Sequence, residues 1–137
     1  MKILILICIV LCNLVSTIAQ AQIGLQKRAW IKVEDLNSIA DYYIDPSSII
    51  NRSESRRVLV LSDRKAPTMT KGSVITEMIF KCNQNAENEF YATYAEEYSG
   101  SMLSGDLVGG GRYPEAGNFK NVFGSYISVS NMVCSRQ

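Results

Sequence analysis

The N-terminal leader constrains this chain most, because it predicts the compartment in which the rest of the chain folds. A single lysine at position 2 precedes Ile3–Cys12, an unbroken apolar run of ten residues. Ala19 and Ala21 then supply the small-x-small pattern of a signal-peptidase cleavage site. We therefore expect residues 1–21 to be a cleaved signal peptide and residues 22–137 to form a single exported domain.

Two other interpretations of the leader remain open. A transmembrane anchor needs about 20 apolar residues, and Asn13, Ser16 and Thr17 interrupt the leader before that length is reached. A lipoprotein signal would use Cys8 or Cys12, but a large aliphatic residue precedes each of them, whereas a lipobox cysteine usually follows a small one. The favoured interpretation is a cleaved signal that leaves no membrane span in the mature chain.

Export makes the cysteine count informative. Two of the four cysteines leave with the leader, so Cys82 and Cys134 remain in an oxidising compartment. An even pair in that setting is typical of a disulfide, and the alternative is two free buried thiols. A metal site is disfavoured because two cysteines without any histidine make an incomplete ligand set.

Charge and residue types exclude several functions. The leader carries one of the 14 basic residues, so 13 basic and 13 acidic side chains remain in a formally neutral mature chain. Nucleic-acid binding relies on an excess of basic charge, and Ser-His-Asp or Cys-His catalysis needs a histidine, which is absent. The pairs Glu87/Glu89 and Glu96/Glu97 are poor carboxylate dyads, since the first lies in a polar turn and strand neighbours such as the second point to opposite faces. We expect no enzymatic activity.

Hydrophobic periodicity predicts a β-sheet. Arg57–Leu61 is apolar on both faces, which is typical of a central strand, and Ser73–Cys82 alternates with a period of two. Phe90–Ala95 follows a polar turn and completes a hairpin. Shorter strand-like segments are Ala29–Val33 and the aromatic-rich Asp41–Asp45, which stops at a proline.

The C-terminal third is less regular. Six glycines and one proline lie between Tyr98 and Gly117, and we expect a loop there. The triple glycine lacks the Lys-Ser/Thr pair of a phosphate-binding loop. Phe119–Cys134 fits either a strand or a helix, and its apolar spacing favours a helix with Ser125 as the N-cap.

Several short motifs follow one another in a recognisable order. They are Trp30, Asp41–Pro46, Ser48-Ile49, Arg57–Leu61, Ser73…Glu77…Phe80–Cys82, Tyr98–Met102, Gly124-Ser125 and Val133-Cys134. This ordered set resembles the surface-adhesin protein E family of Gram-negative bacteria. The resemblance implies an α+β fold, with a curled antiparallel sheet of about six strands and a C-terminal helix tied to the sheet by one disulfide, Cys82–Cys134. The best-known member is an outer-membrane adhesin that binds host extracellular-matrix proteins, and dimers and haem binding are attributed to it.

Two sets of side chains are candidates for binding. A basic set could recruit acidic protein segments or glycosaminoglycans, and it comprises Arg56, Arg57, Arg64, Lys65 and Lys71. An aromatic set could line a site for a flat ligand such as haem, and it comprises Tyr42, Tyr43, Tyr91, Tyr94 and Tyr98. Solvated surface charge and ordinary strand tyrosines are the competing interpretations.

The resulting hypothesis is an exported, non-enzymatic binding protein of the adhesion type, without a cofactor. Its partner would be a protein, such as an extracellular-matrix or envelope protein, and its location the periplasm, the outer-membrane surface or the medium. Edge-strand pairing offers a further route to a partner or to a homodimer. The alternatives are a binder of a small haem-like ligand and a periplasmic inhibitor of a cell-wall enzyme.

Overall fold

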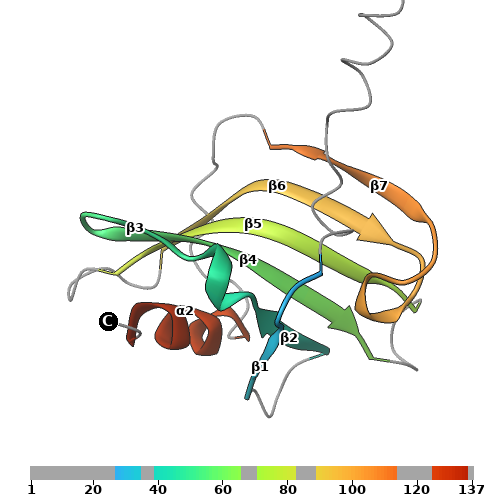
Figure 1. Ribbon diagram of the computed structural model, residues 1–137, viewed down its shortest axis with the longest axis horizontal. Helices are drawn as coiled ribbons and strands as arrows, with labels where there is room; N and C mark the ends of the chain where they lie inside the picture. Colours follow the sequence, from blue (N-terminus) through green and yellow to red (C-terminus); the bar gives the residue numbers. More distant parts are fainter. Residues whose placement is uncertain (1–26, 35–38, 66–70, 83–88, 114–124, 136–137) are drawn as a thin grey trace, which may run out of the picture.

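The computed structural model describes residues 27–34, 39–65, 71–82, 89–113 and 125–135. In these residues an antiparallel sheet of seven strands carries one helix, α2, against one face (Figure 1). The strand order is β1-β2-β4-β5-β6-β7, and the short strand β3 pairs with β4 beside this path. The expected α+β class, curled antiparallel sheet and C-terminal helix are confirmed.

The elements have the following bounds. The strands are β1 (Ile31–Val33), β2 (Ala40–Ile44), β3 (Ile50–Arg52), β4 (Ser55–Arg64), β5 (Ser73–Lys81), β6 (Phe90–Tyr98) and β7 (Leu107–Arg112). The helices are the 3-10 turns η2 (Pro46–Ser48) and η3 (Ser101–Leu103) and the α-helix α2 (Ser125–Ser135). The leader with Ala19 and Ala21, and the 83–88 turn, lie outside the described residues.

The central strand β4 behaves as its sequence predicts. It pairs with β5 along its whole length, from Ser55↔Lys81 to Asp63↔Ser73. Its four middle residues, Val58 to Leu61, are all buried, so both faces of the sheet are covered at this strand. Cross-strand partners project to the same face, and the register therefore assigns every strand residue to one of two faces.

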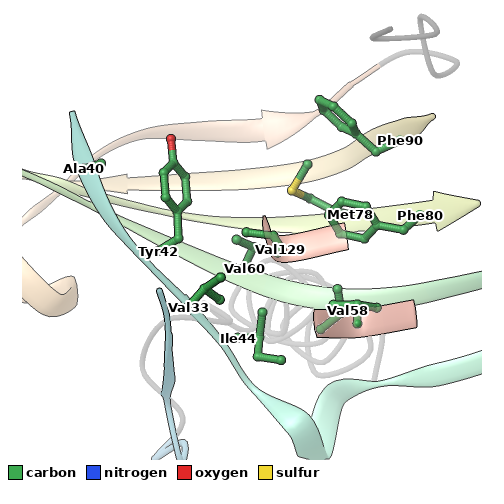
Figure 2. Close-up of a cluster of buried hydrophobic side chains, with 11 residues drawn as sticks. Val33, Ala40, Tyr42, Ile44, Val58, Val60, Met78, Phe80, Phe90 and Val129 are labelled. Carbon is green, nitrogen blue, oxygen red and sulfur yellow. The ribbon is translucent and has the colours of Figure 1, made fainter. Parts of the chain in front are cut away.

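The main core lies between the sheet and α2. Val58 and Val60 of β4 and Phe80 of β5 point toward the helix, which contributes Val129 and Val133 (Figure 2). Both helix valines are fully buried, and their spacing of four residues places them on one side of α2. The helix favoured for the C-terminal segment is thus confirmed, and Ser125, expected as its N-cap, is its first residue.

A second, smaller cluster covers the opposite face. It consists of Leu59, Ile75 and Tyr98, with Trp30 and Leu103 packed against them. Trp30 precedes β1 and Leu103 belongs to η3, so segments from both ends of the sheet meet over its centre. This second cluster explains why β4 needs apolar side chains on both of its faces.

The disulfide joins Cys82 and Cys134, as expected, and excludes the alternative of two free thiols. Cys82 follows directly after β5, and its backbone N–H donates to the carbonyl oxygen of Glu54 at 2.7 Å. Cys134 lies in the last turn of α2. The bond therefore fastens the end of the helix to the end of a central strand.

The loop expected between Tyr98 and Gly117 was wrong in part, because that stretch contains β7. The β6–β7 ladder is made by main-chain groups, so it does not require strand-forming side chains. Gly110 has a φ of +153°, and a Cβ there would lie 2.7 Å from the carbonyl oxygen of Ala95. A glycine that marks a loop in sequence is here required for close strand pairing.

Candidate functional site

The first two basic residues of the predicted set are separated by the sheet. The Arg56 guanidinium donates hydrogen bonds to the carbonyl oxygens of Val133 (2.6 Å) and Cys134 (3.0 Å) at the end of α2. Arg57 points to the opposite face, where it forms an ion pair with Glu77. Positive charge stabilises a helix C-terminus, so Arg56 anchors the helix.

The other three basic residues lie at or beyond the far end of β4. Arg64 pairs with Glu97 of β6 at 2.7 Å. Lys65 lies 3.0 Å from a carboxylate oxygen of Asp41, and its hydrogen bond lowers the pKa of Asp41 although burial opposes the shift. Lys71 is exposed. The structure thus distributes the five basic residues over both faces and engages four of them within the domain.

The five tyrosines are also divided between the faces. Tyr42 belongs to the main core (Figure 2). Its ring meets that of Tyr126 edge-on, with the ring centres 5.2 Å apart. The register places the other four on the face opposite α2: Tyr43, Tyr91, Tyr94 and Tyr98. Because β4 and β5 lie between β2 and β6, Tyr43 is about 14 Å from the β6 tyrosines at ordinary strand spacing.

Two of these tyrosines bind a buried carboxylate. The hydroxyls of Tyr94 and Tyr98 donate to Glu96 at 2.8 and 2.9 Å. Burial, together with the hydrogen bond to Glu96, raises the pKa of Tyr98 to about 12, and the same carboxylate raises the pKa of Tyr94. Both hydroxyls are therefore protonated donors in an internal network.

The motif around Asp45 is structural. Its buried carboxylate accepts hydrogen bonds from Arg28 (2.8 Å) and from both the N–H (3.0 Å) and the hydroxyl (2.6 Å) of Ser47. Burial opposes ionisation, but these hydrogen bonds hold the pKa of Asp45 below its usual value. Asp45 caps η2 with Pro46 at its first position, and it ties the chain before β1 to the sheet.

The loop between β6 and β7, residues 99–106, is held in a strained conformation. Met102 and Leu103 have φ values of 51° and 62°, a region that non-glycine residues seldom adopt. The Asp63 carboxylate accepts from the hydroxyl of Ser101 (2.6 Å) and the N–H of Met102 (3.1 Å). The Ser73 hydroxyl accepts from the N–H of Leu103 at 2.8 Å. Such strain persists only where surrounding contacts enforce it.

This strained loop exposes the side chain of Met102 and partly buries that of Leu103. Leu103 packs against the second cluster, whereas Met102 is 43% exposed. Strained backbone concentrates at functional positions, so the loop is a candidate contact element.

The loop leads into β7, the last strand of the sheet and the uppermost strand in Figure 1. All six residues of β7 are exposed, including Leu107 at 42% and Val108 at 59%. Natural proteins usually protect an edge strand with charged residues, proline, a bulge or a covering segment. In β7 the one charge, Arg112, lies at the end of the strand and the one irregularity lies at Val108, so neither protects Gly109–Gly111. No strand among the described residues pairs with the outer side of β7.

The register shows which main-chain groups of β7 face outward. The N–H of Tyr113 donates to the carbonyl oxygen of Thr93 at 3.1 Å. Inward and outward groups alternate along an antiparallel strand, so Gly110 and Arg112 direct their N–H and C=O groups away from β6. Val108 lies at an irregularity of the ladder, and regular pairing runs from Gly109 onward.

We refer to Met102, Asp106 and β7 together as the edge site. Asp106 and Arg112 are exposed at its two ends and give them opposite charges. None of these residues was predicted from the sequence to form a site. The available signal was Leu107-Val108 next to glycines without a nearby lysine, but a single sequence does not show which strand lies at an edge.

Comparison with known proteins adds the family. Residues 30–135 match the family described as Surface-adhesin protein E. The chain belongs to this family. No curated protein and no solved structure gave a significant match. Membership indicates a surface-adhesin type of function, an exported location and a non-enzymatic role.

Two further observations apply to this surface-adhesin E domain. No helix in the described segments has the length and hydrophobicity needed to cross a membrane. Within the same segments, no three Asp, Glu or Cys side chains cluster closely enough to form a metal site.

Proposed function

We propose that this domain is an exported adhesion-type protein that engages a protein partner through the edge site, at the cell surface or in the periplasm. The observation that carries the proposal is an exposed edge strand with apolar side chains beside a strained loop that Asp63 and Ser73 bind by hydrogen bonds. Such an edge is a template for pairing with another chain. Family membership supports the same class of function.

The edge site is a better candidate than the two sets predicted from sequence. Four of the five basic side chains bind acceptors within the domain. The hydroxyls of Tyr94 and Tyr98 are engaged by Glu96. Among the described residues, no strand pairs with the outward main-chain groups of β7, which supports this edge as the place where a partner strand adds.

Export and a cleaved leader are part of the proposal. The Cys82–Cys134 bond supports them, because disulfides persist in oxidising compartments and are rare in the cytosol. The leader spanning residues 1–21 would be removed, which leaves residues 22–137 as the mature chain. Cell fractionation with surface protease shaving tests this part, and unprocessed chain in the cytosol with alkylatable thiols contradicts it.

A binding measurement tests the function itself. The oxidised mature chain is passed over a panel of purified extracellular-matrix glycoproteins and envelope proteins, with surface plasmon resonance as the readout. Saturable binding at micromolar concentrations to at least one of them is expected. Absence of saturable binding to the whole panel refutes the adhesion-type function.

A further inference from the structure

The edge site also indicates what kind of partner it accepts. We propose that β7 binds an extended segment of a partner protein as an additional antiparallel strand, with large apolar side chains at alternate positions and an acidic residue opposite Arg112. This inference rests on the proposed function and specifies the partner of the same site.

The outward main-chain groups of β7 can form hydrogen bonds with an added strand. Gly110 and Arg112 direct one N–H and one C=O each away from β6, because Tyr113 donates inward to Thr93. An added strand can use these groups without disturbing the β6–β7 ladder. Main-chain bonds of this kind supply affinity in strand addition, and side chains supply specificity.

The space beside Gly109 and Gly111 can hold large side chains of a partner strand. A Cβ built on Gly111 meets nothing within 4 Å, and one built on Gly109 meets only Glu97 Oε2 at 3.9 Å. These two glycines share the face of the sheet that carries Ala95 and Glu97. They leave a shelf without side chains, and large side chains from a neighbouring strand can cover edge glycines of this kind.

The charges at the two ends of the edge site also restrict the partner. Arg112 pairs with Tyr94, and both lie on the face of the sheet opposite the one that carries the glycine shelf. Arg112 is exposed at the end of β7 farther from Asp106. A carboxylate opposite Arg112 and a cation near Asp106 would match both ends. In an antiparallel partner an acidic residue is then followed by large apolar residues one and three positions later, which face Gly111 and Gly109.

A second copy of the chain fits this edge less well. A two-fold antiparallel pairing centred on Gly110 leaves glycine opposite glycine on both copies. One centred on Gly109 places Arg112 opposite Asp106, but Gly109 then lies opposite Gly109 and that part of the shelf stays uncovered. A strand of different sequence can place a carboxylate opposite Arg112 and also cover both glycines of the shelf.

The test uses the full mature chain and a synthetic peptide, Thr-Glu-Phe-Thr-Phe-Thr-Lys, with blocked ends. Titration followed by amide NMR should show saturable binding and slower solvent exchange at the N–H groups of Gly110 and Arg112. A peptide of the same composition with adjacent phenylalanines should bind at least about tenfold more weakly. N-methylation of the residues that face Gly110 and Arg112 should weaken binding by a similar factor.

Variants provide the matched control. Val108→Lys adds a charge to the edge, and Gly109→Phe covers the shelf from within the chain. Each should weaken peptide binding by at least about tenfold. Ile39→Lys should leave it unchanged, because Ile39 is exposed at 57% against 59% for Val108 but does not lie on β7.

The outcomes separate the two proposals. If the chain binds a glycoprotein of the panel but the peptide neither binds nor competes, and both β7 variants bind that glycoprotein normally, strand addition is overturned while the proposed function stands. If β7 instead mediates a dimer that dissociates in the Val108→Lys variant but does not dissociate when the peptide is added, the edge is a self-association surface. That result overturns the inference. A chain that binds the peptide but nothing in the panel refutes the adhesion-type function alone.

Discussion

Replacing both disulfide cysteines, Cys82→Ser with Cys134→Ser, should destabilise the domain without displacing α2. The bond closes a loop with a sequence separation of 52 residues. Loop-closure entropy then predicts a loss of about 4 kcal/mol in the free energy of unfolding. Val129 and Val133 remain fully buried against the sheet, so the helix keeps its apolar contacts in the folded state.

Urea denaturation followed by far-UV circular dichroism measures this loss. The variant should unfold at lower urea with a steeper dependence on denaturant, because an unfolded chain without the cross-link exposes more surface. The parent protein reduced with dithiothreitol is the control and should reproduce the unfolding curve of the variant. The two serines replace thiols of similar size, so the comparison isolates the covalent bond.

Two results would refute the reasoning. A loss below about 1 kcal/mol, with reduction verified by mass spectrometry, would show that the cross-link does not limit the unfolded chain as the loop model requires. Rapid hydrogen exchange at the amides of α2 in a variant whose sheet stays protected would show that the bond, and not the valine packing, holds the helix in place.

Three further predictions follow from buried groups and from the loop. Val133→Ala should cost about 2 kcal/mol from lost burial and a cavity, and Ile127→Ala, at a more exposed site on α2, should cost much less in the same urea assay. Asp45→Asn should cost about 3 kcal/mol because it removes the buried charge that accepts hydrogen bonds from Arg28 and from both donors of Ser47. Folding lowers the pKa of Asp45, so its contribution to stability is present above an unfolded pKa of about 3.9 and is lost as the pH falls through the folded pKa. The difference in unfolding free energy between parent and variant should therefore shrink in acid. A difference that stays constant with pH would contradict this. Asp63→Ala should cost about 1 kcal/mol and speed hydrogen exchange at Met102, and Asp63→Asn, which keeps one acceptor oxygen, should show a smaller effect; equal exchange in all three proteins would show that Asp63 does not hold the loop.

Part of the fold could be predicted because it depends on local pattern. The period-two alternation of Ser73–Cys82 and the two apolar faces of Arg57–Leu61 predict strands and a central position, and both are confirmed. The cysteine pair predicts its own partner, because only one pairing exists once the leader is set aside. The spacing of Tyr126, Val129 and Val133 favoured the helix that the structure contains.

The candidate site could not be predicted in the same way. Glycine lacks a side chain that would report a strand, so Gly109–Gly111 indicated a loop although main-chain bonds to β6 make it part of β7. Arg56 and Arg64 have the composition of a surface patch, but each meets its acceptor in an element distant in sequence. Charge in a sequence does not show whether its partner lies in solvent or within the fold.

The sequence alone therefore determined the strands β1, β2, β4, β5 and β6, the helix, the disulfide and the family resemblance, because each depends on residue types and spacings along one segment or on the cysteine count. Tertiary structure decided which strand lies at the edge, which face each tyrosine occupies and which loop is strained. Strand order sets these properties, and it emerges only when residues far apart in the chain pair, as Asp63 does with the loop before β7.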